Sequence, residues 1–235
     1  MSFAIRSIEK EIIDLRKLTP EETASVYPLI ARVNRRLGGT RVILHYLEEF
    51  SRRWDHEKII RILDVGTGVA DIPAAILRWA KQKKIKIHIT ALDIDSENLT
   101  LAKHRLDSIT DISFVQASSM QLPFAEQSFD YVMASLFFHH LSDEEIIQNL
   151  KNFDHLAKQG IIINDLVRSP AAYAGFFLFS LAAGRNAIFR HDGLLSVKRS
   201  FRLAEARQYI EKAGLSYLKP QRHFAFRMAI AGQKP

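Results

Sequence analysis

The stretch from Ile60 to Pro73, which reads Ile-Arg-Ile-Leu-Asp-Val-Gly-Thr-Gly-Val-Ala-Asp-Ile-Pro, constrains the fold of this chain more than any other. It predicts a buried strand that runs into a tight turn and then into a helix. Because glycine has no Cβ, a ligand can approach the backbone closely at such a turn. The free amides at the start of the helix then face that ligand. The chain is therefore expected to be an α/β protein with a ligand site beside this turn.

The acidic residues around the turn restrict the kind of ligand. A dinucleotide fingerprint would place Gly or Ala at the sixth position of Gly-x-Gly-x-x-Gly, where this chain has Asp71. A negative charge there would repel a pyrophosphate, and no Gly-Lys-Ser/Thr follows to form a phosphate-binding loop. Asp64, which ends the strand, adds a second acid. Two acids favour a cationic ligand, or one with an amine and hydroxyls.

From residue 59 onwards the hydrophobic pattern alternates between strand and helix, which is typical of a parallel α/β sheet. The pattern predicts strands at 59–65, 86–92, 112–116, 129–135 and 160–165. It predicts helices at 72–83, 96–108 with Ser96 as N-cap, from a cap at Ser142 to 156, and 203–213. Two further strands, 215–222 and 225–232, are joined too tightly for a helix, so they should pair antiparallel.

Two helices are expected ahead of the first strand. Thr19-Pro20-Glu21-Glu22 is a capping box with proline at the first helical position, and Gly38-Gly39 stops the helix that begins there. A second helix should run from about 40 to 53. These patterns predict an N-terminal helical cap over residues 1–57. A methyltransferase-like α/β domain over 58–235 would carry a lid-like insertion at 166–201.

The turn Gly66-Thr67-Gly68 after Asp64 resembles motif I of the class I S-adenosylmethionine-dependent methyltransferases, with Ala70 in place of the usual third glycine. The resemblance extends over about residues 59–233. It implies a Rossmann-like, seven-stranded methyltransferase sheet that ends in an antiparallel C-terminal hairpin. It also implies that the cofactor is S-adenosyl-L-methionine.

The resemblance further implies which residues bind that cofactor. Asp93, at the end of the second strand, takes the place of the acid that binds both ribose hydroxyls in the family, and Ile94 would pack on the adenine. Ser118 stands where the family commonly has an acid, so the adenine contact there would be a hydroxyl or a carbonyl. The implied cofactor-binding residues are Asp64, Gly66, Thr67, Gly68, Asp71, Asp93, Ile94, Ser118, Ser119, Met120 and Ser135.

Three histidines are candidate catalytic residues. His139 and His140 follow the fourth strand, where a loop should lie beside the reactive methyl, and His191 lies in the insertion with Asp192 beside it. Histidine can take a proton from a phenol or enol near neutral pH. The alternatives remain a backbone-bonded structural histidine at 139 or 140 and a surface turn that ends at Gly193. With no third ligand evident, no metal site is predicted.

The insertion indicates the kind of acceptor. Between Arg168 and Arg185 it carries no charge, and it is too short to span a bilayer. As a helix apolar on all sides it would fill the core or a homodimer interface, roof an apolar substrate channel, or touch a membrane surface through 169–185. The polar cluster after it, Arg185 to Arg199, suits an acceptor with an ionisable head. The Gly-Thr-Gly-x-x-Asp-Ile turn is similar to that of the ubiquinone/menaquinone methyltransferases, and the Arg-His-Asp-Gly segment resembles bacterial enzymes for polyketide-derived or quinone-like aromatics.

Composition excludes some functions and leaves others open. The chain has no cysteine, which rules out disulfides, thiolate metal sites and cysteine nucleophiles. The net charge of +7 is scattered along the chain, so a nucleic-acid partner is not expected, although an RNA methyltransferase remains the first alternative. A non-catalytic cofactor-binding subunit is the second. The first ten residues lack an apolar signal region, so we expect a cytoplasmic protein. A peripheral contact with the membrane stays open. The predicted activity is methyl transfer to an oxygen or carbon of a small aromatic acceptor that is phenolic, quinone or polyketide-like.

Overall fold

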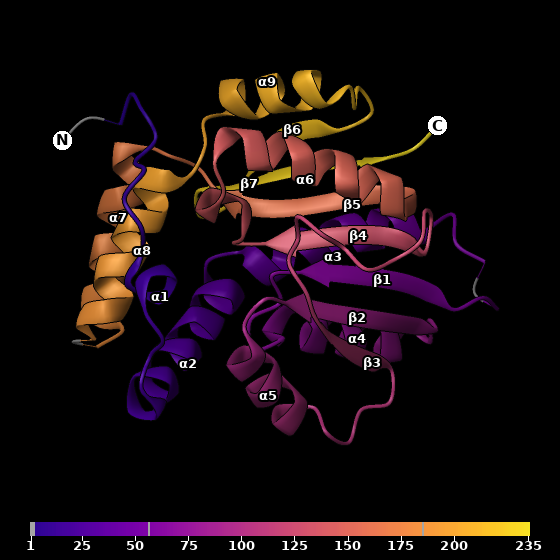
Figure 1. Cartoon of the computed structure of the whole chain (residues 1–235), viewed down its shortest axis with the longest axis horizontal. Coiled ribbons are helices and arrows are strands. Elements are labelled where there is room, and N and C mark those ends of the chain that lie inside the picture. The colour runs from indigo at the N-terminus through magenta and orange to yellow at the C-terminus, as the bar shows by residue number, and fades with distance from the viewer. Residues whose placement is uncertain (1–2, 56, 185) are drawn as a thin grey trace.

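The computed structural model describes residues 3–55, 57–184 and 186–235. In the described chain, seven strands form one mixed sheet in the order β3-β2-β1-β4-β5-β7-β6 (Figure 1). The strands are β1 (Ile60–Val65), β2 (Ile87–Asp93), β3 (Ile112–Gln116), β4 (Phe129–Ser135), β5 (Ala157–Leu166), β6 (Lys219–His223) and β7 (Arg227–Gln233). The predicted fold class, with its antiparallel C-terminal hairpin, is confirmed.

The order of the strands reverses next to β1. This strand pairs parallel with β2 on one side and with β4 on the other. In an open parallel sheet, a ligand site forms at the carboxyl ends of the strands where the order reverses. The strand is buried apart from Arg61, because helices cover both faces of the sheet. The glycine turn after β1 therefore lies at the point where the fold places a site.

The C-terminal strands complete the sheet in the opposite direction. β7 inserts between β5 and β6 and pairs antiparallel with both. The hairpin formed by β6 and β7 turns at Ala225 and Phe226, which both adopt a positive φ of 59°. Such φ values suit a two-residue hairpin turn, although the residues here are not the usual Asn or Gly. The turn brings Arg227 to the same edge of the sheet as the end of β5, since Leu166 is its register partner.

Two layers of helix bury the sheet. One face packs on α3 (Gly39–Ser51), α4 (Asp71–Lys83) and α5 (Ser96–Arg105). The other face packs on α6 (Asp143–Leu156) and α9 (Leu203–Ala213), together with the short 3-10 helix η1 (Phe138–His140). The core is built from strand residues such as Ile62 and Val132, which are fully buried between these layers.

A third group of helices gathers beside the carboxyl ends of the strands. It consists of α1 (Ile12–Leu15), α2 (Pro20–Arg36), α7 (Pro170–Ala182) and α8 (Ala187–Arg199), which Figure 1 shows together at the left of the sheet. Val33 of α2 packs with Phe176 of α7 and Phe189 of α8 in a separate apolar cluster. The helices α1 and α2 and the two helices of the insertion, α7 and α8, therefore form one small layer, although they are far apart in the sequence.

Within this layer the structure corrects two interpretations of the insertion. α7 is not buried on all sides, because Phe177, Leu178 and Leu181 are exposed. The Arg190–Gly193 segment is not a surface turn but part of α8. Gly193 is needed there because a Cβ at this position would lie 2.0 Å from Cζ of Phe176. Arg185, which was assigned to the polar cluster, lies outside the described residues.

Several predicted boundaries also shift. The N-cap of α5 is Asp95 rather than Ser96, since its carboxylate accepts a hydrogen bond of 2.8 Å from the backbone N–H of Glu97. The helix ends at Arg105 rather than near 108. β5 begins three residues before Gly160, and β6 begins at Lys219 because the residues before it form a turn. The capping box at Thr19 and the N-cap at Ser142 are confirmed, and Ser142 also forms a capping box with Glu145.

None of the helices in the described part of the chain is both long and apolar enough to cross a membrane.

Candidate active site

The glycine turn lies open on one side and closely packed on the other. Gly66 has a φ of 71°, and a Cβ there would lie 2.5 Å from the Phe137 ring. Gly68 has a φ of 55°, and a Cβ there would meet no atom of the described residues within 4 Å. The first glycine is therefore required by packing. The second leaves space at the backbone, which is the cradle that a ligand would fill.

Three acids surround this turn, of which Asp64 and Asp93 are buried and Asp71 is half-buried. Asp64 accepts a hydrogen bond of 2.7 Å from the Thr67 hydroxyl, and Asp93 accepts one of 2.7 Å from the backbone N–H of Gly68. Asp71 accepts one of 3.1 Å from the side-chain amide of Asn34. We call Asp64, Asp71 and Asp93, with the turn, the acidic edge.

Burial is the main influence on the protonation of the acidic edge. Burial, together with the neighbouring charges of Asp71 and Asp93, raises the pKa of Asp64 to about 7 against the opposing effect of the Thr67 hydrogen bond. Burial also raises the pKa values of Asp71 and Asp93, although hydrogen bonds partly oppose it. Because three carboxyl groups share one low-dielectric region, a bound cation would favour their ionised forms. The arrangement suits the cationic ligand that the sequence predicts.

Two apolar side chains lie exposed beyond the acidic edge. Ile94, after β2, is 69% exposed, and Met120, after the neighbouring β3, is 38% exposed. The Ser118 hydroxyl accepts a hydrogen bond from the backbone N–H of Met120, whereas Ser119 is buried. Ser135, at the end of β4, accepts one of 2.7 Å from the Asn164 amide. Ile94 and Met120 are thus available to contact a flat ring, and Ser119 and Ser135 support the backbone around them.

His139 lies buried at the end of β4, against the end of β5. Its Nδ1 is 2.7 Å from one Asp165 carboxylate oxygen, and its backbone N–H donates to the other at 3.1 Å. Burial alone would raise the pKa of Asp165, but His139 and the backbone donors hold it below its ordinary value. An ionised Asp165 fixes the proton on Nδ1 and leaves Nε2 as the free, basic nitrogen.

On its other side His139 faces the N-terminal segment. Its Nε2 lies 3.6 Å from a carboxylate oxygen of Glu11, which also accepts a hydrogen bond of 2.9 Å from the Ser196 hydroxyl. Burial raises the pKa of Glu11 to about 7. The imidazole is therefore placed between a carboxylate that orients it and a carboxyl group that is half protonated near neutral pH.

The other two candidate histidines have different surroundings. His140 is half-buried, and its Nδ1 is 3.0 Å from the Asp14 carboxylate. The side chain of His191 is 55% exposed, and its Nδ1 lies 2.8 Å from Asp192. The Asp192 carboxylate also accepts the backbone N–H groups of Ile12 and Ile13, so it anchors the N-terminal segment. The structure brings the His140 ring next to that of His139, with centroids 4.2 Å apart, whereas His191 lies on α8 with an exposed side chain.

A cavity of about 210 Å³ lies under the helical layer and beside His139; we call it the acceptor cavity. Its wall is mostly apolar, with Leu136, Leu166 and Phe176 among the residues that line it. Its polar side chains include Glu11, His139, His140, Ser196 and Arg227. It combines an apolar interior with a base and few other polar groups, which is the usual composition of a small-molecule site.

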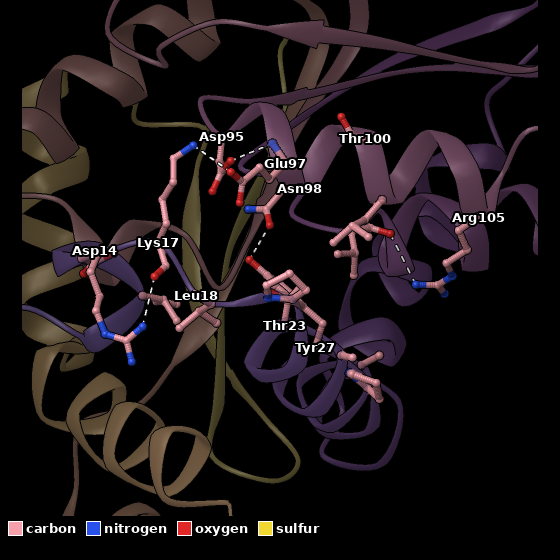
Figure 2. Close-up of a pocket in the computed structure, with 18 of the residues that line it drawn as sticks. Asp14, Lys17, Leu18, Thr23, Tyr27, Asp95, Glu97, Asn98, Thr100 and Arg105 are labelled. Carbon is pink, nitrogen blue, oxygen red and sulfur yellow. Dashed lines mark hydrogen bonds and ion pairs between the residues drawn. The ribbon is translucent and has the colours of Figure 1, made fainter.

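A larger cleft, of about 1370 Å³, lies between the N-terminal segment and α5 (Figure 2). Lys17 reaches across it to Glu97 at 2.8 Å, and Tyr27 donates a hydrogen bond to the Asn98 side chain. Its wall includes Val69 and Asp95, each next to a part of the acidic edge. Among the described residues it shares only Ile13 with the lining of the acceptor cavity, and none of the three candidate catalytic histidines lines it. This cleft is accordingly an approach to the acidic edge and not the reaction centre.

Three residues of the site escaped the sequence prediction. Asp165 is the second-last residue of β5, close to the strand end as Asp93 is in β2, so its position was a usable signal. Arg227 is a lone arginine in an apolar strand, which was also a signal. Glu11 lies in a short polar segment that no pattern connects with the site. Together with His139 and His140, Glu11 forms a group whose ligand atoms lie within 4.8 Å of one another, so the third ligand that a metal would need is present.

Comparison with known proteins finds methyltransferases among the proteins similar to this chain. Residues 62–160 match the family described as methyltransferase domain. Among curated proteins, the ubiquinone/menaquinone biosynthesis C-methyltransferase UbiE of Rickettsia bellii (strain OSU 85-389) is 34% identical over 85 residues, 35% of this chain and 34% of that protein. The same enzyme of Bartonella quintana (strain Toulouse) is 41% identical over 75 residues, 30% of this chain and 27% of that protein. The match thus spans about a third or less of these relatives.

Solved structures share the fold over most of the chain. The CMeT domain of the citrinin polyketide synthase aligns with a TM-score of 0.70 and 11% identity, covering 95% of this chain and 59% of that one. A SAM-dependent methyltransferase from Aquifex aeolicus aligns with a TM-score of 0.62 and 16% identity, covering 92% and 99%. The plantazolicin methyltransferase BpumL, in complex with SAH, aligns with a TM-score of 0.64 and 14% identity, covering 89% and 90%. Residues 62–160 thus match the methyltransferase-domain family, and most of the chain shares the fold of solved S-adenosylmethionine-dependent methyltransferases.

Proposed function

We propose that this chain transfers a methyl group from S-adenosylmethionine to an oxygen or carbon of a small, largely apolar aromatic acceptor, which is phenolic, quinone or polyketide-like. The observation that carries the proposal is the His139–Asp165 pair at 2.7 Å, on the wall of an apolar cavity. A buried imidazole held by an ionised carboxylate is suited to accept a proton from a hydroxyl or an acidic carbon.

The acidic edge would hold the cofactor. Each oxygen of Asp93 accepts one backbone N–H and the carboxylate also hydrogen-bonds the Asn98 side chain, so its remaining acceptor positions would take the ribose hydroxyls. Gly68 offers an open backbone to the amino-acid part, and Asp64 offers a carboxylate to its amine. Ile94 and Met120 would contact the adenine. When bound, the cofactor supplies an activated methyl group, so the protein has mainly to position the acceptor and to remove a proton.

Proton removal is assigned to His139. His139 lines the acceptor cavity, and its Nε2, which lies 3.6 Å from Glu11, would take the proton of an acceptor O–H or C–H group. Asp165 is a positioning residue that keeps the proton on Nδ1 and stabilises the imidazolium once it forms. The apolar wall around the cavity excludes water, which strengthens both interactions. We propose that the lid-like insertion and the N-terminal cap together provide that enclosure.

The names of the relatives support this acceptor class. The UbiE proteins are C-methyltransferases of ubiquinone/menaquinone biosynthesis, and the CMeT domain belongs to a polyketide synthase. The two alternatives are less favoured. An RNA substrate needs a broad basic groove, whereas the cavity beside His139 is small and apolar. A non-catalytic subunit would have no use for a buried, oriented base.

The test is methyl transfer from S-adenosylmethionine with a deuterated methyl group. The purified chain would be incubated with hydroxynaphthoquinones, alkylphenols and aromatic polyketides, and products would be read by mass spectrometry. We expect one labelled methyl group on at least one acceptor and none with boiled protein. Cofactor binding without transfer to any acceptor would favour the non-catalytic alternative. Transfer to RNA, with affinity that falls steeply as salt rises, would favour the other.

We further propose that the exposed face of α7 contacts either a membrane surface that holds the acceptor or a second copy of the chain. Its exposed Phe177, Leu178 and Leu181 form the face that either a membrane-surface contact or a homodimer would use. Sedimentation with and without neutral phospholipid vesicles distinguishes the two. A triple change of these residues to Ser should abolish whichever association the wild-type chain shows.

A further inference from the structure

Arg227 occupies an unusual position for a charged side chain. It is the first residue of β7 and is fully buried. Its Nε donates a hydrogen bond of 2.9 Å to the Leu37 carbonyl. Its two terminal nitrogens, Nη1 and Nη2, have no hydrogen-bond partner among the described residues. The side chain also lines the acceptor cavity.

Burial of an unpaired guanidinium is costly, so its retention needs a reason. A buried polar group without a partner destabilises the folded state, and a charged one does so more strongly. Burial lowers the pKa of Arg227 to about 10, although Asp165 and Asp71 oppose that effect. The group therefore stays charged at neutral pH. Neither acid is within hydrogen-bonding distance of the two terminal nitrogens in the described chain, and Asp165 already binds His139.

The Leu37 contact gives the guanidinium a direction. With Nε fixed, the outer edge of the group presents two parallel N–H donors, which match a carboxylate in a bidentate pair. A hydroxyl or a carbonyl would use one donor and leave the charge unpaired. The chemistry of the site therefore selects a planar anion over a neutral head group.

We propose that Arg227 binds a carboxylate of the methyl acceptor, so that the acceptor is an apolar aromatic acid. This inference rests on the proposed function and narrows its acceptor class. A carboxylate could also come from the amino-acid part of the cofactor. The acceptor is favoured because Arg227 lines the cavity that includes His139, whereas none of Asp64, Gly66, Gly68 and Asp93 lines it.

The test uses two ligands that differ only in charge, 2-naphthoate and 2-naphthamide, with binding measured by calorimetry in the presence of S-adenosylhomocysteine. Wild-type protein should bind 2-naphthoate at least tenfold more tightly than 2-naphthamide. Arg227→Gln should remove this preference, and Arg227→Lys should reduce it, because lysine keeps the charge but lacks the fork. Arg222→Gln, on the exposed face of neighbouring β6, is the matched control and should leave the preference unchanged.

The outcomes are distinct. Equal affinity for the two ligands in wild-type protein, no binding of either, or a preference that survives in Arg227→Gln would each overturn the inference. If Arg227→Gln instead weakens S-adenosylhomocysteine binding tenfold and keeps the naphthoate preference, the cofactor carboxylate is the true partner. Failure of wild-type protein to bind S-adenosylhomocysteine at all would count against the proposed function itself.

A thermal melt separates binding from folding. If Arg227 served only the fold, its replacement would lower the melting temperature. A buried charge without a partner instead predicts that Arg227→Gln melts at or above the wild-type temperature, because replacement of a poorly paired buried charge is often neutral or stabilising. A variant that melts clearly lower would contradict this, and Arg227→Lys would then carry the binding comparison.

Discussion

The acidic edge and the acceptor cavity are built in opposite ways. Most of the acidic edge comes from one continuous stretch, Asp64 to Asp71, with Asp93 from the next strand. The reactive wall of the acceptor cavity comes from four separate segments, which contribute Glu11, His139, Asp165 behind it, and Arg227. The first is a local structure that one strand-turn-helix unit determines. The second exists only after the N-terminal segment, the sheet and the C-terminal hairpin have packed together.

Their electrostatics differ as well. The acidic edge concentrates three carboxyl groups, and no cationic side chain of the described residues donates a hydrogen bond to them, so this region suits a positively charged ligand. The cavity contains a carboxylate–imidazole pair and a buried guanidinium, so it handles a proton and awaits negative charge. A fold that separates the two charges in this way can hold a cationic donor and an acidic acceptor next to each other. If the comparison is right, changes in one region should leave binding in the other intact.

The largest effect is expected for His139→Asn. Loss of the base should lower kcat by about 10²–10⁴-fold, because proton transfer by a positioned side chain contributes that much. The affinity for S-adenosylhomocysteine should stay within twofold. Turnover kinetics and calorimetry check the two parts, and His104→Asn, an exposed histidine on α5, is the control.

Asp165→Asn sharpens the same prediction. It should lower kcat, though less than loss of the base itself, and change the pH profile, since the amide cannot stabilise an imidazolium. A variant of His139 that loses cofactor binding together with turnover would break the separation between the two regions.

The next effect is expected on the other side, for Asp93→Asn. Two hydrogen bonds to a charged group should be lost or weakened, which corresponds to an affinity for S-adenosylhomocysteine lower by about 100-fold. Binding of 2-naphthoate should change little. Asp107→Asn, an exposed acid just beyond α5, should alter neither. Unchanged cofactor affinity in Asp93→Asn would remove the ribose assignment.

How much of each region could be predicted follows from the same contrast. The strands at 112–116 and 129–135 and the helix at 203–213 have the predicted bounds, because local hydrophobic periodicity and caps determine them. The acidic edge could be predicted because strand ends and a glycine turn leave a mark in the sequence. The partners of His139 could not, since the contact with Glu11 depends on tertiary packing across the whole chain. The prediction of Ser96 as the N-cap of α5 was wrong, because both Asp95 and Ser96 are good N-cap residues and only the backbone geometry decides between them.

The pH dependence of cofactor binding should report the acidic edge alone. Burial raises the pKa of Asp64 to about 7, and a cation binds best when this carboxyl group is ionised. Below that pKa a proton must be released on binding, so affinity falls as pH falls. We expect S-adenosylmethionine to bind about tenfold more weakly at pH 6 than at pH 8. Calorimetry in buffers of different ionisation enthalpy would count the released proton. Asp64→Asn should make the affinity independent of pH over this range. An affinity that does not change with pH in the wild type would show that Asp64 does not face the positive charge.

The smallest effect, no change at all, is expected when metal ions are removed. Glu11, His139 and His140 lie close enough to hold an ion, but each is already engaged. Glu11 is about half protonated at pH 7 and accepts from Ser196, and His140 contacts Asp14, which Arg199 also binds at 2.9 Å. An ion would have to ionise Glu11 and sit near that guanidinium. Dialysis against a chelator should therefore leave turnover within twofold, whereas added Zn²⁺ should inhibit, and more strongly at pH 8 than at pH 6, because Glu11, with a pKa of about 7, loses its proton over that range. Loss of turnover on chelation, restored by a divalent ion, would instead make this cluster a metal centre and His139 a ligand rather than a base.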